Sequence, residues 1–369
     1  MRIVFDGRWM GRTGIGRYAD ELLDQLQRLD QSNEYLVLLL PKYFETWTPA
    51  APNFNKVLTS HEVYTWQEQV LLPRQIKALK PDLVHFTSFN LPLSYHGDFV
   101  TTVHDLTLIN FKNVRGSGLK KALYEAKYQV MKQVLAASVG RAQAVITPTE
   151  YVRDGLSERF PAATKKMHVT WEAVSPDFAA PADISRFKLP DEYLLYVGNY
   201  YPYKNVERLV RAFVRTDAYG RGVSLVLNGK ADYFQDRIRD VAKELDTRGL
   251  IVFPGYTSDS ELAGLYRGAK LFVLPSLSEG FGLPGLEAMT QSLPVLASRE
   301  SCFPEVYADA ASYFDGYDIA DMAEKIDILL ANPAEMDALK VAGLERVKQF
   351  SWETMARQTI GIYEASKRS

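Results

Sequence analysis

Short aliphatic runs alternate with longer amphipathic segments along this chain, and the alternation occurs twice. The short runs are rich in aliphatic and β-branched side chains, as strands buried on both faces of a sheet are. A strand followed by a helix, repeated several times, requires a parallel sheet with helices on both faces. The sequence therefore predicts an α/β fold made of two doubly wound, Rossmann-like domains.

The expected elements fall into two sets. In the first half, strands are expected at 2–5, 35–40, 83–86, 99–103 and 144–147, with helices at 15–29, 66–79, 119–137 and 150–159. In the second half, strands are expected at 193–197, 224–227, 250–253, 271–274 and 295–297, with helices at 206–214, 234–245, 260–267 and 283–290. Three more helices are expected at 319–330, 334–349 and 352–366.

A segment with three prolines, residues 174–191, separates the two sets and reads as a linker. We therefore expect a domain over 1–173, a second domain over 192–350, and a final helix within 351–369 that packs back on the first domain. Two such domains would face each other across a cleft. Ligands of open α/β sheets bind beyond the carboxyl ends of the strands, so residues in those places are the first candidates for a site.

Composition excludes several classes of protein. The 369 residues include 43 Lys and Arg against 45 Asp and Glu, which argues against a broad nucleic-acid-binding surface. A single cysteine, Cys302, can form neither an internal disulfide nor a zinc cluster and favours a reducing compartment. No apolar run approaches the roughly 18 residues of a membrane span. We expect a cytoplasmic protein.

The most specific chemical signal lies at 275–297, PSLSEGFGLPGLEAMTQSLPVLA. Gly280 and Gly282 allow a tight loop after a strand, and Pro284 suits the first turn of the following helix. The N-terminus of that helix would attract a phosphate group. Glu279 and Glu287 could both face one ligand and accept hydrogen bonds from sugar or ribose hydroxyls. The alternative is a tight turn with two solvated glutamates.

Other candidates also follow expected strands. Lys204 begins a helix, where an ordinary lysine would oppose the helix dipole, and it could neutralise the charge of a departing phosphate. His104 could hydrogen-bond a sugar hydroxyl, with Asp105 to orient it, although a satisfied buried histidine is the usual alternative. His85 is either a structural or an acceptor-side residue.

These segments resemble a known family. SEGFGLPGLEAM is similar to the E-x7-E signature of glycosyltransferase family 4, whose members are retaining nucleotide-sugar transferases with the GT-B fold. LLYVGNYYPYKNVERLVRAF, LVLNGK, VFPGYTSDSELAGLYRGAKLFVLPS and FPEVYADAA resemble the donor domain. TGIGRYADELL, PDLVHFTSF, TTVHDL and AQAVITPTEYVRDGL resemble the acceptor domain of the mannosyltransferase-like branch. The resemblance covers nearly the whole chain.

The resemblance implies an activity. It implies transfer of a hexose from a nucleoside diphosphate sugar to a glycan or lipid-linked hydroxyl, as in polysaccharide or lipopolysaccharide biosynthesis. GDP-mannose is the first-choice donor, and UDP-glucose or another sugar nucleotide is the alternative. Residues 1–173 would bind the acceptor and residues 192–350 the donor. No cofactor and no metal are expected, since the chain has no D-x-D-type acidic cluster after a strand.

The resemblance also implies roles for single residues. Glu279, His104 and Lys204 would be catalytic. Asp105 would lie on the acceptor side, as would His85 in the second of its two roles. Glu287 would hold the ribose, and further donor contacts would come from Gly16, Asn199, Tyr256, Gly280, Phe281, Gly282 and Leu283. Four positions depart from the family pattern: Asn199 and Tyr203 stand where many members have arginine, and Ser292 and Ala308 replace usual glycines.

Three alternatives come from other classes. Gly14, Gly16 and Ala19 satisfy G-x-G-x-x-G/A, which would suit an NAD(P)-dependent oxidoreductase, although the glycines lie far from the strand end. A non-catalytic sugar-binding scaffold could keep the same fold. Paired carboxylates also occur in glycosidases, but those enzymes do not need a phosphate-directed helix end.

A basic stretch at 112–132 carries six lysines and arginines against one acid, Glu125. Apolar residues recur in it at roughly helical spacing, so the stretch could lie on an anionic membrane. The alternative is a solvated basic face of a helix that packs on its own domain. We therefore expect at most a weak peripheral contact with the inner face of a membrane.

Overall fold

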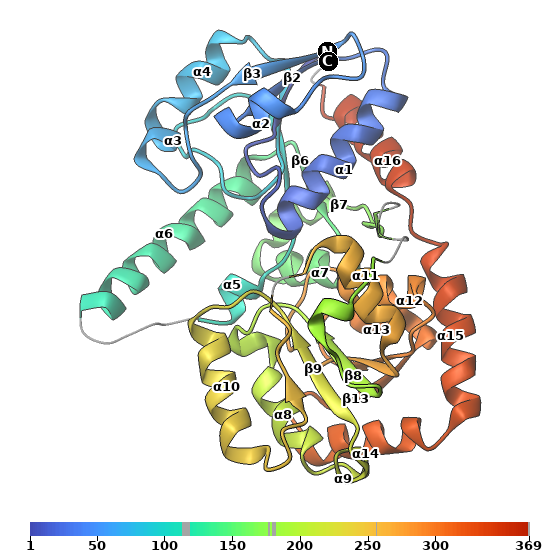
Figure 1. The fold of residues 1–369 in the computed structure, drawn as a ribbon. Coiled ribbons are helices and arrows are strands. Elements are labelled where there is room, and N and C mark those ends of the chain that lie inside the picture. The colour runs from blue at the N-terminus through green and yellow to red at the C-terminus, as the bar shows by residue number, and fades with distance from the viewer. Residues whose placement is uncertain (113–118, 176–177, 179–181, 256, 368–369) are drawn as a thin grey trace. The chain divides into compact units, whose positions relative to one another are not determined.

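The computed structural model describes residues 1–112, 119–175, 178, 182–255 and 257–367, and it divides the chain into two compact units (Figure 1). The first unit holds Met1–Glu172 and Ser351–Ser369, and the second holds Ala173–Phe350. The first unit therefore contains both ends of the chain, and its last helix, α16 (Trp352–Ala365), packs on α1 (Thr13–Leu29).

Seven parallel strands form the sheet of the first unit, in the order β3-β2-β1-β4-β5-β6-β7. The central strands are buried at every residue or nearly so, because helices cover both faces of the sheet. The strands are β1 (Arg2–Asp6), β2 (Glu34–Leu39), β3 (Phe54–Leu58), β4 (Leu83–Phe86), β5 (Phe99–Thr102), β6 (Ala144–Thr147) and β7 (Met167–Val169).

The helices of the first unit connect these strands. They are α1, α2 (Pro41–Thr46), α3 (Trp66–Val70), α4 (Leu72–Ala78), α5 (Thr107–Asn110), α6 (Leu119–Arg141), α7 (Glu150–Arg159) and α16, with a 3₁₀ turn at Pro161–Lys166. Unlike the other helices, α6 does not pack against the unit along its whole length. Its side chains are buried mainly from Val134 onward, and its N-terminal half extends away from the sheet (Figure 1).

Six parallel strands form the sheet of the second unit, in the order β10-β9-β8-β11-β12-β13. They are β8 (Tyr193–Val197), β9 (Ser224–Asn228), β10 (Ile251–Val252), β11 (Leu271–Leu274), β12 (Val295–Ser298) and β13 (Ala311–Phe314). The helices are α8 (Val206–Phe213), α9 (Asp217–Arg221), α10 (Tyr233–Leu245), α11 (Asp259–Gly268), α12 (Leu283–Thr290), α13 (Phe303–Tyr307), α14 (Ile319–Leu330) and α15 (Pro333–Val347). Short 3₁₀ turns occur at Ser185–Phe187, Pro202–Lys204 and Ala308–Ala310.

The strand order fixes where each unit can bind a ligand. The chain reverses its direction of winding between β1 and β4 in the first sheet and between β8 and β11 in the second. At such a point the loops after the two neighbouring strands separate and leave a crevice at the carboxyl edge. The two α/β sheets confirm the predicted fold class.

The structure corrects several expected elements. The helix expected at 66–79 is two helices, since α3 ends at Val70 and Pro73 falls in the first turn of α4. Strands β3, β7 and β13 and the short helices α2, α5, α9 and α13 were not anticipated. β3 and β7 lie at the edges of their sheet, and their partly exposed residues break the continuous apolar pattern of a buried strand.

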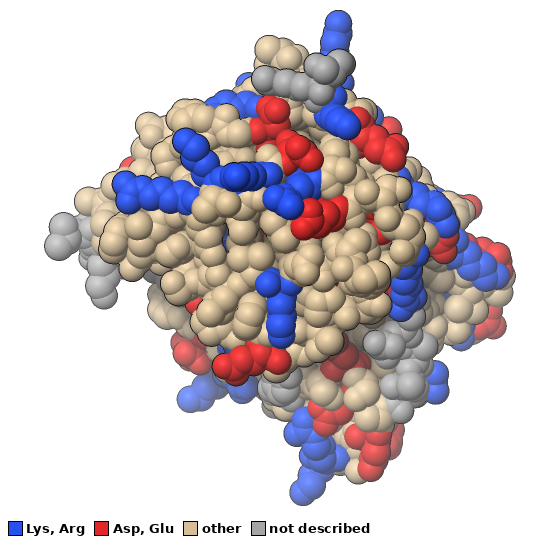
Figure 2. Space-filling view, turned by 90° about the horizontal axis from the view of Figure 1, so that it is seen from above, with Lys and Arg blue, Asp and Glu red and all other residues tan. Residues whose placement is uncertain are grey.

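Surface charge is mixed. Lysines and arginines are interspersed with aspartates and glutamates on the face shown in Figure 2, in keeping with a net charge of −2. Among the residues that the structure describes, no helix has both the length and the apolar character needed to cross a membrane.

Two of the departures from the family pattern fall at strained backbone. Ser292 has a φ of 55°, and Ala308 has a φ of 48° with a ψ of −123°. A side chain in the left-handed region costs about 1–2 kcal/mol, and the Ala308 conformation is one that glycine adopts far more readily. The usual glycines therefore have a backbone reason, and this chain has kept the turns without them.

We predict that Ala308→Gly stabilises the second unit. Relief of strain of about 1–3 kcal/mol outweighs the extra chain entropy of glycine, about 0.4–1 kcal/mol. A net gain near 1 kcal/mol should raise Tm by roughly 2–4 °C in calorimetry. As a control, Ala323→Gly in the middle of α14 should lower stability by about 1 kcal/mol. A lower Tm for Ala308→Gly would contradict the strain argument.

Candidate active site

An ion pair marks the switch point of the second unit. Lys204 closes the 3₁₀ turn after β8, and Glu279 lies in the loop after β11. The Lys204 ammonium group donates a charge-assisted hydrogen bond to Oε1 of Glu279, and the two side chains are 12% and 15% exposed. The pair balances both charges in a nearly water-free place. An anion that attracts Lys204 would release Glu279 to accept hydrogen bonds from another group.

The backbone on each side of this pair is held by a neighbouring side chain. Ser301 accepts a hydrogen bond from the Glu279 amide at 2.6 Å and donates one to the Glu279 carbonyl at 2.9 Å. Asn205, in the left-handed conformation, donates from Nδ2 to the carbonyls of Pro275 at 3.0 Å and Gly316 at 2.7 Å. The two loops are therefore tied to the same framework before any ligand arrives.

The N-terminus of α12 lies in the same loop. Gly282 precedes the helix with a φ of 87°, and Tyr307 donates a hydrogen bond of 2.5 Å to its carbonyl oxygen. A Cβ atom at Gly282 would lie 2.5 Å from that tyrosine hydroxyl, so only glycine fits. Within the helix, Glu287 is 4% exposed and accepts a hydrogen bond of 3.2 Å from Tyr266.

In the first unit, His104 is bonded at both ring nitrogens. Nε2 donates to the Thr87 carbonyl at 2.8 Å, and Nδ1 lies 3.3 Å from Oε1 of Glu172. Burial disfavours the charged imidazole, but the hydrogen bond and charge of Glu172 outweigh it and raise the pKa of His104 above 6.5. The acceptor at each ring nitrogen therefore favours the doubly protonated imidazolium. Glu172, not Asp105, orients the ring, because Asp105 accepts from the Thr107 amide instead.

His85 lies in the interior beside this pair. Nδ1 is 2.6 Å from the Tyr363 hydroxyl on α16, and Nε2 is 2.9 Å from Thr102, which also bonds Tyr18 at 3.0 Å. The side chain is fully buried, and burial lowers the pKa of His85 to about 3. This placement supports the structural one of its two expected roles, because a neutral, doubly bonded imidazole joins α16 to the sheet.

A buried charge network holds the loop after β1. Arg8 is 1% exposed and donates to both oxygens of Asp6 at 2.7 Å and to Glu68 at 2.9 Å. Asn90 donates to the same glutamate at 2.9 and 3.1 Å. Removing one member of such a network would leave an unpaired buried charge, at a cost of about 3–5 kcal/mol. The loop that leads to Gly16 is therefore firmly anchored.

Both halves of the chain match models of known protein families. The model described as Glycosyltransferase Family 4 matches residues 12–178, and that described as Glycosyl transferases group 1 matches residues 181–346. O-antigen chain mannosyltransferase B of Escherichia coli is 28% identical over 376 residues, covering 95% of this chain and 96% of that protein. The chain belongs to glycosyltransferase family 4. Serotype-specific mannosyltransferase WbdA of Escherichia coli is 30% identical over 306 residues, but these are 77% of this chain and 37% of that protein.

Solved structures show the same fold. Sucrose-phosphate synthase from Thermosynechococcus elongatus superimposes with a TM-score of 0.76 at 20% identity, covering 99% of this chain and 98% of that one. The chain is thus a GT-B glycosyltransferase, and two of its relatives are named O-antigen chain mannosyltransferases. The oxidoreductase alternative is not supported. Gly14 and Gly16 lie inside α1, and a Cβ at Gly16 would come within 2.5 Å of the Trp9 carbonyl oxygen, which explains that glycine without a dinucleotide.

The remaining donor-side residues of the glycosyltransferase are placed as follows. Asn199 accepts a hydrogen bond from the Tyr201 amide at 3.2 Å within the loop after β8. Phe281 is buried with its ring edge against Phe350, while Gly280 and Leu283 are partly exposed. Tyr256 lies outside the described residues. Donor contacts from these residues stay predictions.

Sequence reasoning missed the residues that hold the candidate catalytic groups. Glu172 orients His104, Ser301 fixes Glu279, and Asn205 fixes the turn that carries Lys204. None follows from a motif, since each acts through a partner distant in the chain. Across the described ranges, no three His, Cys, Asp or Glu side chains come together in a way that could hold a metal ion.

We predict that Glu172→Gln lowers the pKa of His104. The variant keeps the size of the side chain but loses the negative charge that favours imidazolium, and each pKa unit lost equals about 1.4 kcal/mol. Titration of the His104 ring by NMR measures the change, with Glu158→Gln on the exposed face of α7 as the control. An unchanged titration in Glu172→Gln would contradict the pairing.

The same pair should make stability depend on pH. Because the folded pKa of His104 is raised, its contribution is fully present below about pH 6.5 and is lost as the pH rises through the folded pKa. Wild type should therefore exceed Glu172→Gln in unfolding free energy by more at pH 6 than at pH 9.

Proposed function

We propose that this glycosyltransferase transfers mannose from GDP-mannose to a hydroxyl group of a lipid-linked glycan, with retention of anomeric configuration. The mannosyl donor is supported by the names of the relatives, which include O-antigen chain mannosyltransferases. A lipid-linked O-antigen-type acceptor fits the same names. Such an enzyme would act at the cytoplasmic face of a membrane.

The Lys204–Glu279 pair at the switch point carries the proposal. A donor has two parts that match the two members of the pair: a diphosphate, which a lysine attracts, and sugar hydroxyls, which a carboxylate accepts. The N-terminus of α12 adds hydrogen-bond donors for phosphate oxygens. We assign the ribose hydroxyls to Glu287, the fifth residue of that helix.

Transfer would proceed as an exchange of partners. The donor diphosphate draws the Lys204 ammonium away from Glu279, and Glu279 accepts hydrogen bonds from the bound hexose. The bond between the anomeric carbon and the phosphate oxygen breaks, and a bond from the acceptor oxygen forms on the same face. The acceptor proton passes to an oxygen of the departing diphosphate, whose charge Lys204 stabilises.

A donor screen tests the proposed activity. The protein is incubated with GDP-mannose, UDP-glucose and other sugar nucleotides together with a lipid-linked glycan acceptor, and nucleotide release and product mass are measured. Transfer from GDP-mannose is the expected result. Transfer from UDP-glucose alone would overturn the choice of donor, and binding without turnover would favour a scaffold.

We predict that replacing Glu279 lowers the rate of transfer, whereas replacing Glu287 weakens binding of the nucleoside diphosphate. Glu279→Ala should lower kcat by about 10- to 100-fold while nucleoside diphosphate binding is kept, because its hydrogen bonds reach the sugar. Glu287→Ala should weaken diphosphate binding in calorimetry by about 1.5–3 kcal/mol. Glu324→Ala, exposed on α14, is the control for both. Loss of diphosphate binding in Glu279→Ala would contradict the assignment.

We predict that turnover continues in excess EDTA. The reason is that Lys204 and helix N-termini can balance the diphosphate charge, and the sequence shows no oxygen-ligand cluster after a strand. Initial rates with and without chelator, measured on protein first dialysed against it, make the comparison. A rate that falls in EDTA and returns with one divalent ion would refute the prediction.

α6 offers a surface for the membrane that a lipid-linked acceptor requires. Leu123 and Val130 are 57% and 54% exposed, and Lys121, Lys127 and Lys132 are exposed as well. Lys112 is paired with Glu125 at 2.9 Å and contributes less than the sequence suggested. Arg115 lies outside the described residues, as does the side chain of Lys120. Apolar and basic side chains on a projecting helix suit an anionic bilayer surface.

We predict weak, salt-sensitive binding to anionic vesicles. Each lysine near the surface adds about 1 kcal/mol, and screening weakens the attraction as the Debye length falls to about 3 Å at 1 M salt. Replacement of Lys121, Lys127 and Lys132 by Glu should abolish co-sedimentation at low salt. The charge-matched control replaces Lys243, Lys340 and Lys348 by Glu in the second unit. Equal sedimentation of both variants would show that α6 is only a solvated surface.

A further inference from the structure

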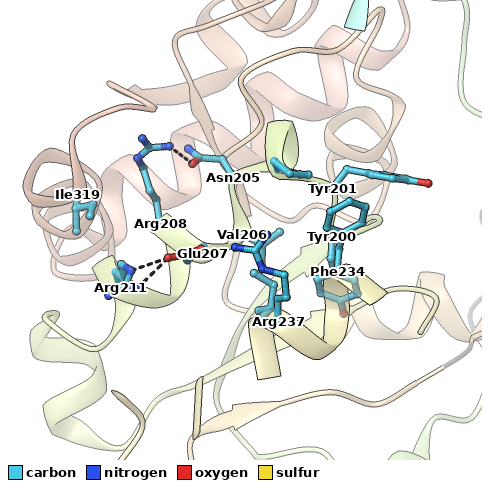
Figure 3. Close-up of a pocket in the computed structure, with 12 residues that line it drawn as sticks. Tyr200, Tyr201, Asn205, Val206, Glu207, Arg208, Arg211, Phe234, Arg237 and Ile319 are labelled. Carbon is cyan, nitrogen blue, oxygen red and sulfur yellow. Dashed lines mark hydrogen bonds and ion pairs between the residues drawn. The ribbon is translucent and has the colours of Figure 1, made fainter. Parts of the chain in front are cut away.

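A cavity of about 340 Å³ lies between α8, α10 and the start of α14 in the second unit (Figure 3). Three arginines line it: Arg208 and Arg211 from α8, and Arg237 from α10. The rings of Tyr201 and Phe234 line another part of its wall. Neither Lys204, Glu279 nor Glu287 lines this cavity, so it is distinct from the candidate donor site.

The arginines leave positive charge in the cavity. Arg211 is bonded to Glu207 at 2.9 and 3.1 Å, while the hydrogen-bond partner of Arg208 among the described residues is the neutral Asn205, at 2.8 Å. Arg237 reaches from α10 toward α8, and the described residues give it no hydrogen bond or ion pair (Figure 3). Three guanidinium groups therefore share one carboxylate. Such groups bind phosphate through two parallel hydrogen bonds, so the surplus charge favours an anion of this type.

The apolar wall narrows the class of ligand. The Tyr201 and Phe234 rings lie 4.8 Å apart with their planes tilted by 54°, so the cavity that holds the guanidinium groups also has two aromatic rings in its wall. A free inorganic ion would use only the charges. An anion that also carries a ring can stack on the aromatic side chains. We propose that this cavity binds a small organic phosphate, with the phosphoryl group at Arg208 and Arg237 and a sugar or base ring at Tyr201.

The cavity is connected to the candidate donor site, so the ligand would also regulate it; this part rests on the proposed function. Arg208 bonds the Asn205 side chain, and that side chain holds the Pro275 carbonyl at the start of the Glu279 loop. Asn205 also directly follows Lys204. A phosphate that engages Arg208 competes for its bond to Asn205 and thereby changes the support of both Lys204 and Glu279.

Calorimetric titration of the full chain tests the site. The probes are mannose 6-phosphate, adenosine monophosphate and inorganic phosphate, with mannose as the uncharged comparison. The two organic phosphates should bind more tightly than inorganic phosphate, and mannose should give no heat. Whichever organic phosphate binds more tightly distinguishes a sugar from a nucleotide ligand.

Three variants separate this site from the donor site. Arg237→Gln should weaken binding about tenfold, because it removes a charge-assisted contact from a side chain that supports no other group. Glu207→Gln should strengthen binding by removing the one carboxylate of the cavity, a gain that a structural role would not produce. Lys243→Gln removes the same charge from α10 outside the cavity and should change nothing.

Four results would overturn the proposal. They are no heat with either organic phosphate, equal binding of mannose, unchanged affinity in Arg237→Gln, or an equal loss in Lys243→Gln. These outcomes do not depend on which sugar nucleotide the protein uses.

For the regulatory part, saturating ligand should change kcat at least twofold in wild type but not in Arg237→Gln at the same concentration. An unchanged kcat in wild type would overturn that part alone.

Discussion

Every strand pair in both sheets is parallel, and the central strands are buried on both faces. Such a strand leaves no place for a charged side chain until the chain reaches the carboxyl edge. The parallel arrangement also brings all those edges to the same side of the sheet. Lys204 and Glu279 meet in this way, although they are 75 residues apart in sequence. The candidate chemistry of each unit is thus a consequence of strand direction.

The charged groups at these edges differ in how easily they can change partners. Arg8 is enclosed by Asp6 and Glu68 and has almost no contact with solvent, so its role is to hold backbone. Lys204 and Glu279 keep a small exposed fraction, so an incoming ligand can displace one member without exposing a bare charge to a dry interior. The enclosed Arg8 network is suited to holding the backbone, and the partly exposed Lys204–Glu279 pair is suited to binding a ligand.

Sequence patterns predicted the two α/β sheets, most strands and the loop geometry around Gly282, because apolar runs and glycines report local requirements. They failed where the contact of a side chain depends on a residue distant in the sequence. The carboxylate that contacts His104 is Glu172 and not the expected Asp105, and the sequence around neither residue indicates this. The burial of His85 likewise depends on Tyr363, which is 278 residues away. Edge strands such as β3 were not predicted, because their exposed side chains resemble those of a loop.

The position of α16 has a consequence for how the chain is made. This helix packs on α1 and bonds the interior through Tyr363, yet it is translated only after the whole second unit. The second unit is complete by Phe350, while the first still lacks one of its helices. During synthesis the first unit, which begins to be translated first, is therefore completed after the second. Removal of α16 would therefore disturb the first unit, whose other elements all precede the second unit in sequence.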